Sequence, residues 1–84
     1  MEHLHFEFDA SAGKRIAVKL NTQAFVRLMD PLNYTMYQSG GRYTYYGGLA
    51  VRTPAPLTIP HAGHWHVAID LNGHSGYVQA EIVG

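Results

Sequence analysis

Two histidines stand two positions apart near the C-terminal end of the chain, at His64 and His66. Residues two apart on a β-strand leave the same face, so both imidazoles would point the same way. Two imidazoles on one face can bind one metal ion, and a carboxylate would add a third ligand. Asp70 lies about 13 Å from His66 along the same strand, at 3.3 Å per residue, and cannot join them. A third ligand must therefore come from another strand.

The next strand along the chain carries Glu81 as the candidate third ligand. Asn72-Gly73, between two alternating runs, favours a β-hairpin. A two-residue turn would place Glu81 opposite His64, and a four-residue turn would place it opposite His66. The candidate metal site is therefore His64, His66 and Glu81.

Histidine is frequent elsewhere in the chain as well, with six in total. His3 and His5 repeat the same spacing and would meet the first pair if the terminal strands lie side by side. Histidines on a solvated sheet face ordinarily bind no metal, and a His–Glu cross-strand pair contributes only ~0.2–1 kcal/mol. We therefore expect no cofactor, with a divalent metal as the alternative. A pH-sensitive contact is a third interpretation, because imidazoles gain charge between neutral and acidic pH.

Tyrosines are concentrated in the segment Pro31–Gly48, which we expect to be a long loop. It holds five of the six tyrosines, together with glycine, serine and asparagine. This composition is typical of antibody paratopes, because tyrosine offers rigid amphipathic area at low entropic cost. The alternative is that these rings pack in the core or cover a sheet edge. The candidate binding residues are Tyr34, Tyr37, Arg42, Tyr43, Tyr45, Tyr46 and Arg52.

The elements that would position these residues are strands, because apolar and polar residues alternate through most of the chain. Seven short strands in 84 residues predict one antiparallel β-sandwich over residues 1–84, with a small closed barrel as the alternative. Trp65 is expected at the centre of the core. The strands are expected near residues 4–8, 16–20, 24–28, 49–53, 57–59, 65–71 and 78–82, and the core neighbours of Trp65 are expected to be Phe6, Val18, Val26, Val67, Ile69 and Val78.

Composition excludes several classes of protein. The hydrophobic fraction is 46% and the charged fraction 14%, which argues against a disordered chain. Six basic and six acidic residues balance, so nucleic acid or anionic lipid is disfavoured as the main partner. The absence of cysteine removes disulfides, thiolate metal sites and a cysteine nucleophile. No apolar run approaches the ~20 residues of a membrane span, and no signal peptide is recognisable, so we expect a soluble cytoplasmic protein.

Five motifs spread over nearly the whole chain carry a resemblance. They are Val26-Arg27-Leu28-Met29-Asp30, Asn33-Tyr34, Tyr45-Tyr46-Gly47-Gly48, Pro60-His61-Ala62-Gly63-His64-Trp65 and Ile69-Asp70-Leu71. They resemble a small bacterial family catalogued as domain of unknown function eighteen-eighty-three, and the Pro-His-Ala-Gly-His-Trp run is the most specific. The resemblance implies a compact all-β domain, found alone or at the N-terminus of longer proteins, some of which carry a TIR domain. It assigns no catalytic residue.

We expect a non-enzymatic binding or assembly module that uses the tyrosine-rich loop to hold a protein, a glycan or a second copy of the chain. The resemblance implies a sensing or oligomerising role linked to TIR-type proteins. A histidine-based divalent-metal-binding protein or small metal-dependent enzyme is the first alternative. A single-stranded nucleic-acid binder is the second, and the two lysines and zero net charge count against it.

Overall fold

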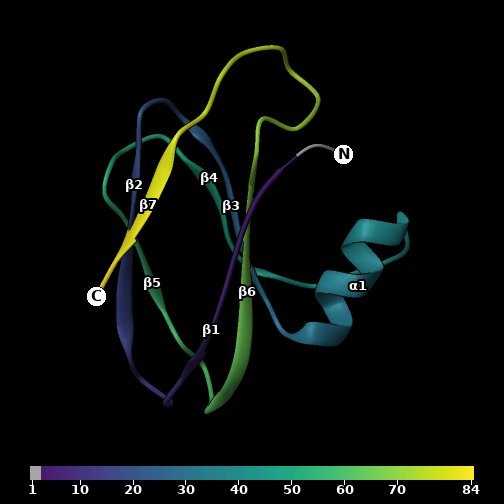
Figure 1. The fold of residues 1–84 in the computed structure, drawn as a ribbon, viewed down its shortest axis with the longest axis vertical. Coiled ribbons are helices and arrows are strands. Elements are labelled where there is room, and N and C mark those ends of the chain that lie inside the picture. Colours follow the sequence, from purple (N-terminus) through teal and green to yellow (C-terminus); the bar gives the residue numbers. More distant parts are fainter. Residues whose placement is uncertain (1–2) are drawn as a thin grey trace.

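Two antiparallel sheets pack face to face in the computed structural model, which describes residues 3–84 (Figure 1). One sheet has the strand order β1-β6-β3-β4 and the other β5-β2-β7. The predicted β-sandwich is confirmed, and over the described residues the two sheets do not close into a barrel. The elements are β1 (Leu4–Ala10), β2 (Arg15–Leu20), β3 (Ala24–Met29), α1 (Pro31–Ser39), β4 (Tyr46–Ala50), β5 (Ala55–Thr58), β6 (Gly63–Asp70) and β7 (Ala80–Val83).

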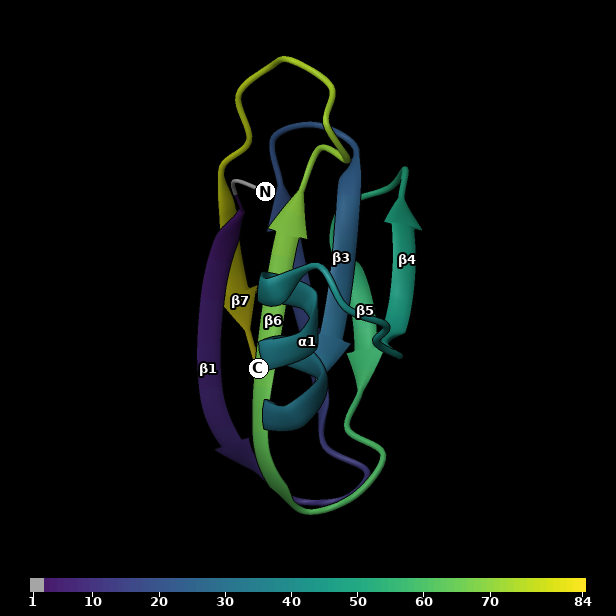
Figure 2. The same ribbon diagram turned by 90° about the vertical axis from the view of Figure 1, so that its right-hand side faces the viewer.

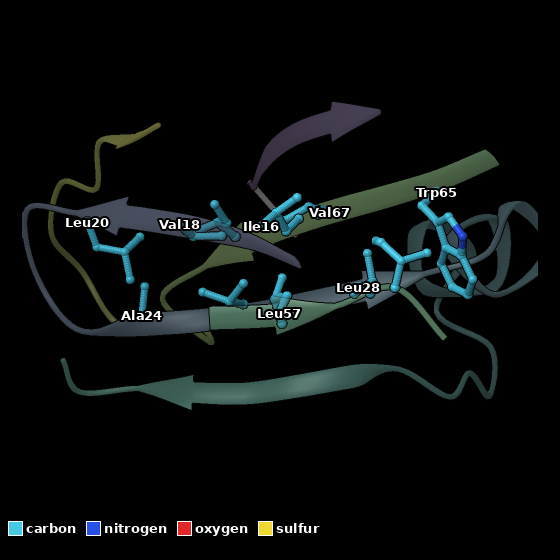
Figure 3. Packing of buried hydrophobic residues seen from close by; sticks show 11 residues of the cluster. Ile16, Val18, Leu20, Ala24, Leu28, Leu57, Trp65 and Val67 are labelled. Atoms are coloured by element: carbon cyan, nitrogen blue, oxygen red, sulfur yellow. The ribbon is translucent and has the colours of Figure 1, made fainter. Parts of the chain in front are cut away.

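The core lies between the sheets, where the inward-facing residues of each alternating strand meet. Figure 3 shows Leu28, Trp65 and Val67 in this space. Trp65 is 1% exposed, and its indole N–H donates to the His61 carbonyl at 3.0 Å, so its one polar group is satisfied. The predicted orientation of this strand is confirmed. Of the expected neighbours, Val18, Val26, Val67 and Ile69 are buried, and Phe6 and Val78 are partly buried against the same cluster.

β6 occupies a central place in the four-stranded sheet. β1 pairs with one of its edges and β3 with the other, both antiparallel. Asn72-Gly73 does form a turn, in which the His74 N–H donates to the Leu71 carbonyl at 3.1 Å. The chain then crosses to the other sheet, where β7 pairs with β2. The predicted β6–β7 hairpin is therefore wrong, because both edges of β6 are already paired.

The third ligand predicted from that hairpin is wrong for the same reason. Glu81 on β7 lies opposite Lys19 on β2, and both side chains are exposed. They face outward from the three-stranded sheet, because their neighbours Val18 and Ile82 face the core. Glu81 and the histidines of β6 thus lie on opposite outer surfaces of the sandwich.

The first half of the expected loop is a helix. Asp30 caps α1, since its carboxylate accepts the Asn33 N–H at 2.8 Å, and Pro31 occupies the first turn. Gly40 ends the helix with a φ of 80°, a left-handed conformation that favours glycine. Figure 2 shows α1 lying across the outer face of the four-stranded sheet, over β6 and β3. Within residues 3–84, no helix is both long and apolar enough to cross a membrane.

Candidate functional site

Polar and aromatic side chains gather on the outer face of the four-stranded sheet. Because Trp65 and Val67 point inward, the alternate residues His64 and His66 of β6 point outward. The antiparallel register with β1 places Glu7 directly opposite His66 and Asp9 opposite His64. Strand pairing thus brings together residues that are nearly sixty positions apart in the sequence.

Three side chains of this face, His5, Glu7 and His66, offer ligand atoms that all lie within 4.8 Å of one another. We call them the histidine cluster. His5 Nε2 and His66 Nδ1 are hydrogen-bonded at 2.7 Å. Their ring centroids are 5.0 Å apart and their planes differ by 12°, so the two imidazoles lie edge to edge in nearly one plane. One Glu7 carboxylate oxygen, Oε2, lies 3.5 Å from His5 Nε2 and 3.9 Å from His66 Nδ1.

Tyr34 of α1 forms the floor of the histidine cluster. Its ring stacks on His5 with centroids 4.2 Å apart and on His66 with centroids 4.5 Å apart. The Tyr34 hydroxyl and His3 Nε2 are hydrogen-bonded at 2.9 Å, and Tyr34 is 7% exposed. Burial, with a smaller contribution from Glu7, raises the pKa of Tyr34, so the ring stays neutral beneath the imidazoles.

His64 lies at the rim of the cluster. Its Nδ1 is 2.8 Å from Asp9 Oδ1, and its Nε2 is 3.3 Å from Glu7 Oε1. The hydrogen bond to Asp9 raises the pKa of His64, while burial and the neighbouring His5 lower the pKa of His66. Two histidines on one strand therefore favour opposite protonation states, with a neutral imidazole on the buried His66.

A second polar group lies farther along β6, beneath α1. The Asp70 carboxylate is 1% exposed and accepts hydrogen bonds from the Arg27 guanidinium and from the Tyr37 hydroxyl, the latter at 2.5 Å. Its other oxygen accepts the Asn72 N–H at 2.8 Å. The guanidinium carbon of Arg27 also lies 5.3 Å from the Tyr45 ring centroid. This network fastens α1 to the sheet, because Tyr37 is a helix residue.

The predicted tyrosine-rich binding surface is divided between several environments. Tyr34 is buried, and Tyr37 and Tyr43 are half-buried and in ring contact with centroids 5.2 Å apart. Tyr45 and Tyr46 are exposed by 41% and 53%. Tyr45 lies on the outer face, whereas Tyr46 lies on the inner face of β4 with its ring centroid 6.1 Å from that of Trp65. The two remaining predicted residues, Arg42 and Arg52, are exposed beyond opposite ends of β4.

An apolar groove lies beside β4, where the two sheets meet at their edges. It measures about 300 Å³ and is lined by Val26, Leu49, Val51 and Leu57 together with both prolines that flank Ala55. Gly47 lies here with its backbone close to β3, since a Cβ atom would come within 2.4 Å of the Val26 carbonyl oxygen. Arg52 contributes to the same groove, apart from the other predicted binding residues.

Neither the role of Glu7 as the carboxylate of the histidine cluster nor the buried ion pair of Arg27 and Asp70 was predicted from the sequence. The repeated spacing of His3 and His5 did predict a meeting with His66 if the terminal strands paired. The terminal strands β1 and β7 do not pair within residues 3–84, but β1 pairs with β6, and His5 makes the contact with His66 there. The sequence does indicate Arg27 and Asp70, because Arg27 lies within an apolar strand and Asp70 ends another, between Ile69 and Leu71.

A family model described as "Domain of unknown function (DUF1883)" matches residues 1–83. No curated protein matches the chain, and no solved structure matches it.

Proposed function

The chain belongs to the family of the domain of unknown function DUF1883, and we propose that it is a non-enzymatic assembly module that pairs with a second copy of itself along β4. The observation that carries this proposal is the distribution of exposed apolar side chains. Four of the seven large ones found among the described residues fall within residues 45–51, namely Tyr45, Tyr46, Leu49 and Val51. Exposed apolar area concentrated on one segment is typical of an interaction surface.

The backbone of β4 supports the same proposal. β4 pairs with β3 on one side, and within residues 3–84 no strand pairs with its other edge. Proteins usually protect such edges with charged residues or proline. The β5 edge contains Pro56, and the β1 edge carries Glu7 and Asp9. By contrast, β4 has the sequence Tyr-Gly-Gly-Leu-Ala, without charge or proline.

A second β4 strand is the occupant that fits best. Antiparallel pairing of β4 with itself is self-complementary about a twofold axis, as most homodimer interfaces are. It would join two four-stranded sheets into one and satisfy the free backbone groups of both edges. Side chains of the added strand that face inward would meet the groove lined by Val26 and Leu57. Where a relative carries a TIR domain, as the resemblance implies, such pairing would bring two TIR domains together.

Analytical ultracentrifugation over a range of protein concentrations tests the proposal. We expect a reversible dimer in the wild-type chain and a monomer in Leu49→Lys, because a charged lysine on an edge strand opposes edge-to-edge pairing. Leu32→Lys is the matched control, since Leu32 is 71% exposed on α1 and lies outside β4. It should dimerise like the wild type. A wild-type chain that stays monomeric at millimolar concentration, or a Leu49→Lys variant that dimerises normally, would contradict the proposal.

A further inference from the structure

We propose that His5, Glu7 and His66 form a binding site for one divalent transition-metal ion, with zinc as the reference ion. This site is separate from the β4 edge, because it lies between β1 and β6, at the opposite edge of the same sheet. It also differs from the set expected from the sequence, since Glu81 is replaced by Glu7 and His64 by His5. Two imidazoles and one carboxylate are a ligand set that zinc and its neighbours in the first transition row accept.

The distances between the ligand atoms match the size of a zinc site. His5 Nε2, His66 Nδ1 and Glu7 Oε2 form a triangle with sides of 2.7, 3.5 and 3.9 Å. The edge of a tetrahedron around zinc is about 3.3 Å, given zinc–ligand bonds of 2.0–2.1 Å. The average side of the triangle is close to that edge. Binding would lengthen the nitrogen–nitrogen contact by about 0.6 Å, turn both imidazoles so that their lone pairs point at the ion, and draw the carboxylate inward.

The ring nitrogens also suit a metal. His5 Nε2 and His66 Nδ1 face each other at hydrogen-bond distance, so one of them carries the proton that the two share. On metal binding this proton would move through solvent to the other nitrogen of the same ring, and each neutral imidazole would then donate one electron pair to the ion. Glu7 has 54% of its side chain exposed, so the cluster is open to solvent. That opening gives an ion an entry path and leaves a fourth position for water.

Surrounding side chains hold the three ligands in place. Tyr34 stacks beneath both imidazoles and fixes their common plane, and its hydroxyl is hydrogen-bonded to His3. His64 holds the second oxygen of Glu7 and is itself held by Asp9. Partners of this kind orient metal ligands and typically change metal affinity by about 10–100-fold when removed. The site is therefore supported on the helix side by Tyr34 and at the rim by His64.

Isothermal titration calorimetry with zinc chloride is the primary test, performed on the full chain without a histidine tag. We expect one equivalent of zinc to bind with a Kd below about 10 µM. His5→Gln and Glu7→Gln should each weaken binding at least tenfold. These two variants are chosen because both side chains are partly exposed, so the fold should tolerate the change. His74→Gln and Glu81→Gln are the matched controls and should leave the Kd unchanged.

A second measurement separates loss of ligands from loss of structure. Nitrogen-15 spectra of the imidazoles should show that zinc shifts His5 and His66 and leaves His61 and His74 in place. Cobalt(II) should give the visible absorption of a four-coordinate site in the wild-type chain and lose it in Glu7→Gln. Absence of binding tighter than about 10 µM, or equal affinity in His5→Gln, Glu7→Gln and the wild type, would overturn the proposal. Zinc shifts confined to other histidines would do the same.

Discussion

Replacement of Asp70 by asparagine would test how much the buried ion pair beneath α1 stabilises the fold. The Arg27 side chain is 6% exposed and that of Asp70 is fully buried, so neither charge is solvated in the folded state. Asparagine keeps the shape of the side chain but leaves the guanidinium uncompensated. Breaking a buried pair in this way costs ~3–5 kcal/mol. An 84-residue domain has a free energy of unfolding of about 4–13 kcal/mol, so the loss would be a large part of it.

The pH dependence of the stability lost in Asp70→Asn follows from the direction in which the pKa of Asp70 is shifted. Burial acts to raise the pKa of Asp70, but hydrogen bonds from Tyr37 and Arg27 outweigh it and hold the pKa below its ordinary value of 3.8. A lowered folded-state pKa contributes stability that is complete above the unfolded value and is lost as the pH falls through the folded value. The difference between wild type and Asp70→Asn should therefore be largest at neutral pH and shrink below about pH 4.

Urea unfolding followed by Trp65 fluorescence at neutral and acidic pH provides the measurement. Asp9→Asn is the control for a carboxylate on the same face, because Asp9 has 87% of its side chain exposed and its removal should cost at most about 1 kcal/mol. Combining Arg27→Met with Asp70→Asn should recover part of the loss, since the orphaned charge disappears. The reasoning is refuted if Asp70→Asn unfolds within about 1 kcal/mol of the wild type at pH 7. It is refuted equally if the difference does not change with pH.

Three further substitutions test the core, the helix and the β4 edge by thermal and urea unfolding. Trp65→Ala should cost ~3–5 kcal/mol, because it empties the largest fully buried site, and near-normal melting would contradict its inward orientation. Asp30→Ala should cost ~0.5–2 kcal/mol through loss of the α1 cap, and an unchanged free energy of unfolding would show that the cap is dispensable. Gly47→Ala should cost ~1–3 kcal/mol more than Gly13→Ala. Both glycines have a positive φ, but only at Gly47 would the added Cβ meet the Val26 carbonyl oxygen. Equal costs would show that the backbone moves to accommodate the Cβ atom.

Local pattern predicted most of the strands and which of their faces points inward, but the strand expected at residues 49–53 is β4, which begins earlier and ends at Ala50. The alternation around Trp65 holds through β6, and the residues expected beside it belong to or pack against the same core cluster. Trp65 itself lies at one end of that cluster and not at the expected centre (Figure 3). The buried face of a strand can be predicted because the alternation of apolar and polar residues within that strand indicates it. The two-sheet architecture follows from the number and shortness of those strands.

Which strands pair with one another could not be predicted from the local sequence pattern. Asn72-Gly73 makes the turn that its residue types favour, yet the strands on either side of it belong to different sheets. A turn rule describes only a few residues, whereas the partners of β6 come from the N-terminal third of the chain. The same limit explains the site, because Glu7 reaches His66 through the β1–β6 register alone.

The helix was missed although its signals were present. The segment that begins at Pro31 is expected to be a loop, but Asp30 and Pro31 are residue types typical of a helix cap and first turn. Asn33, Thr35 and the two tyrosines between Pro31 and Ser39 have only moderate helix propensity, so composition favoured a loop. Packing of Tyr34 and Tyr37 on the sheet stabilises the helix instead.

The central position of β6 also sets the order in which the domain can form during synthesis. β1 and β3 leave the ribosome long before β6. The edges of β1 and β3 that pair with β6 therefore stay unpaired until β6 has been made. Pairing of strands that are far apart in the sequence makes folding slow, because the chain loses loop-closure entropy before the contacts between the strands stabilise it. The four-stranded sheet therefore assembles only after most of the chain has been made, and until then a nascent chain exposes strand edges that aggregation or a chaperone can reach.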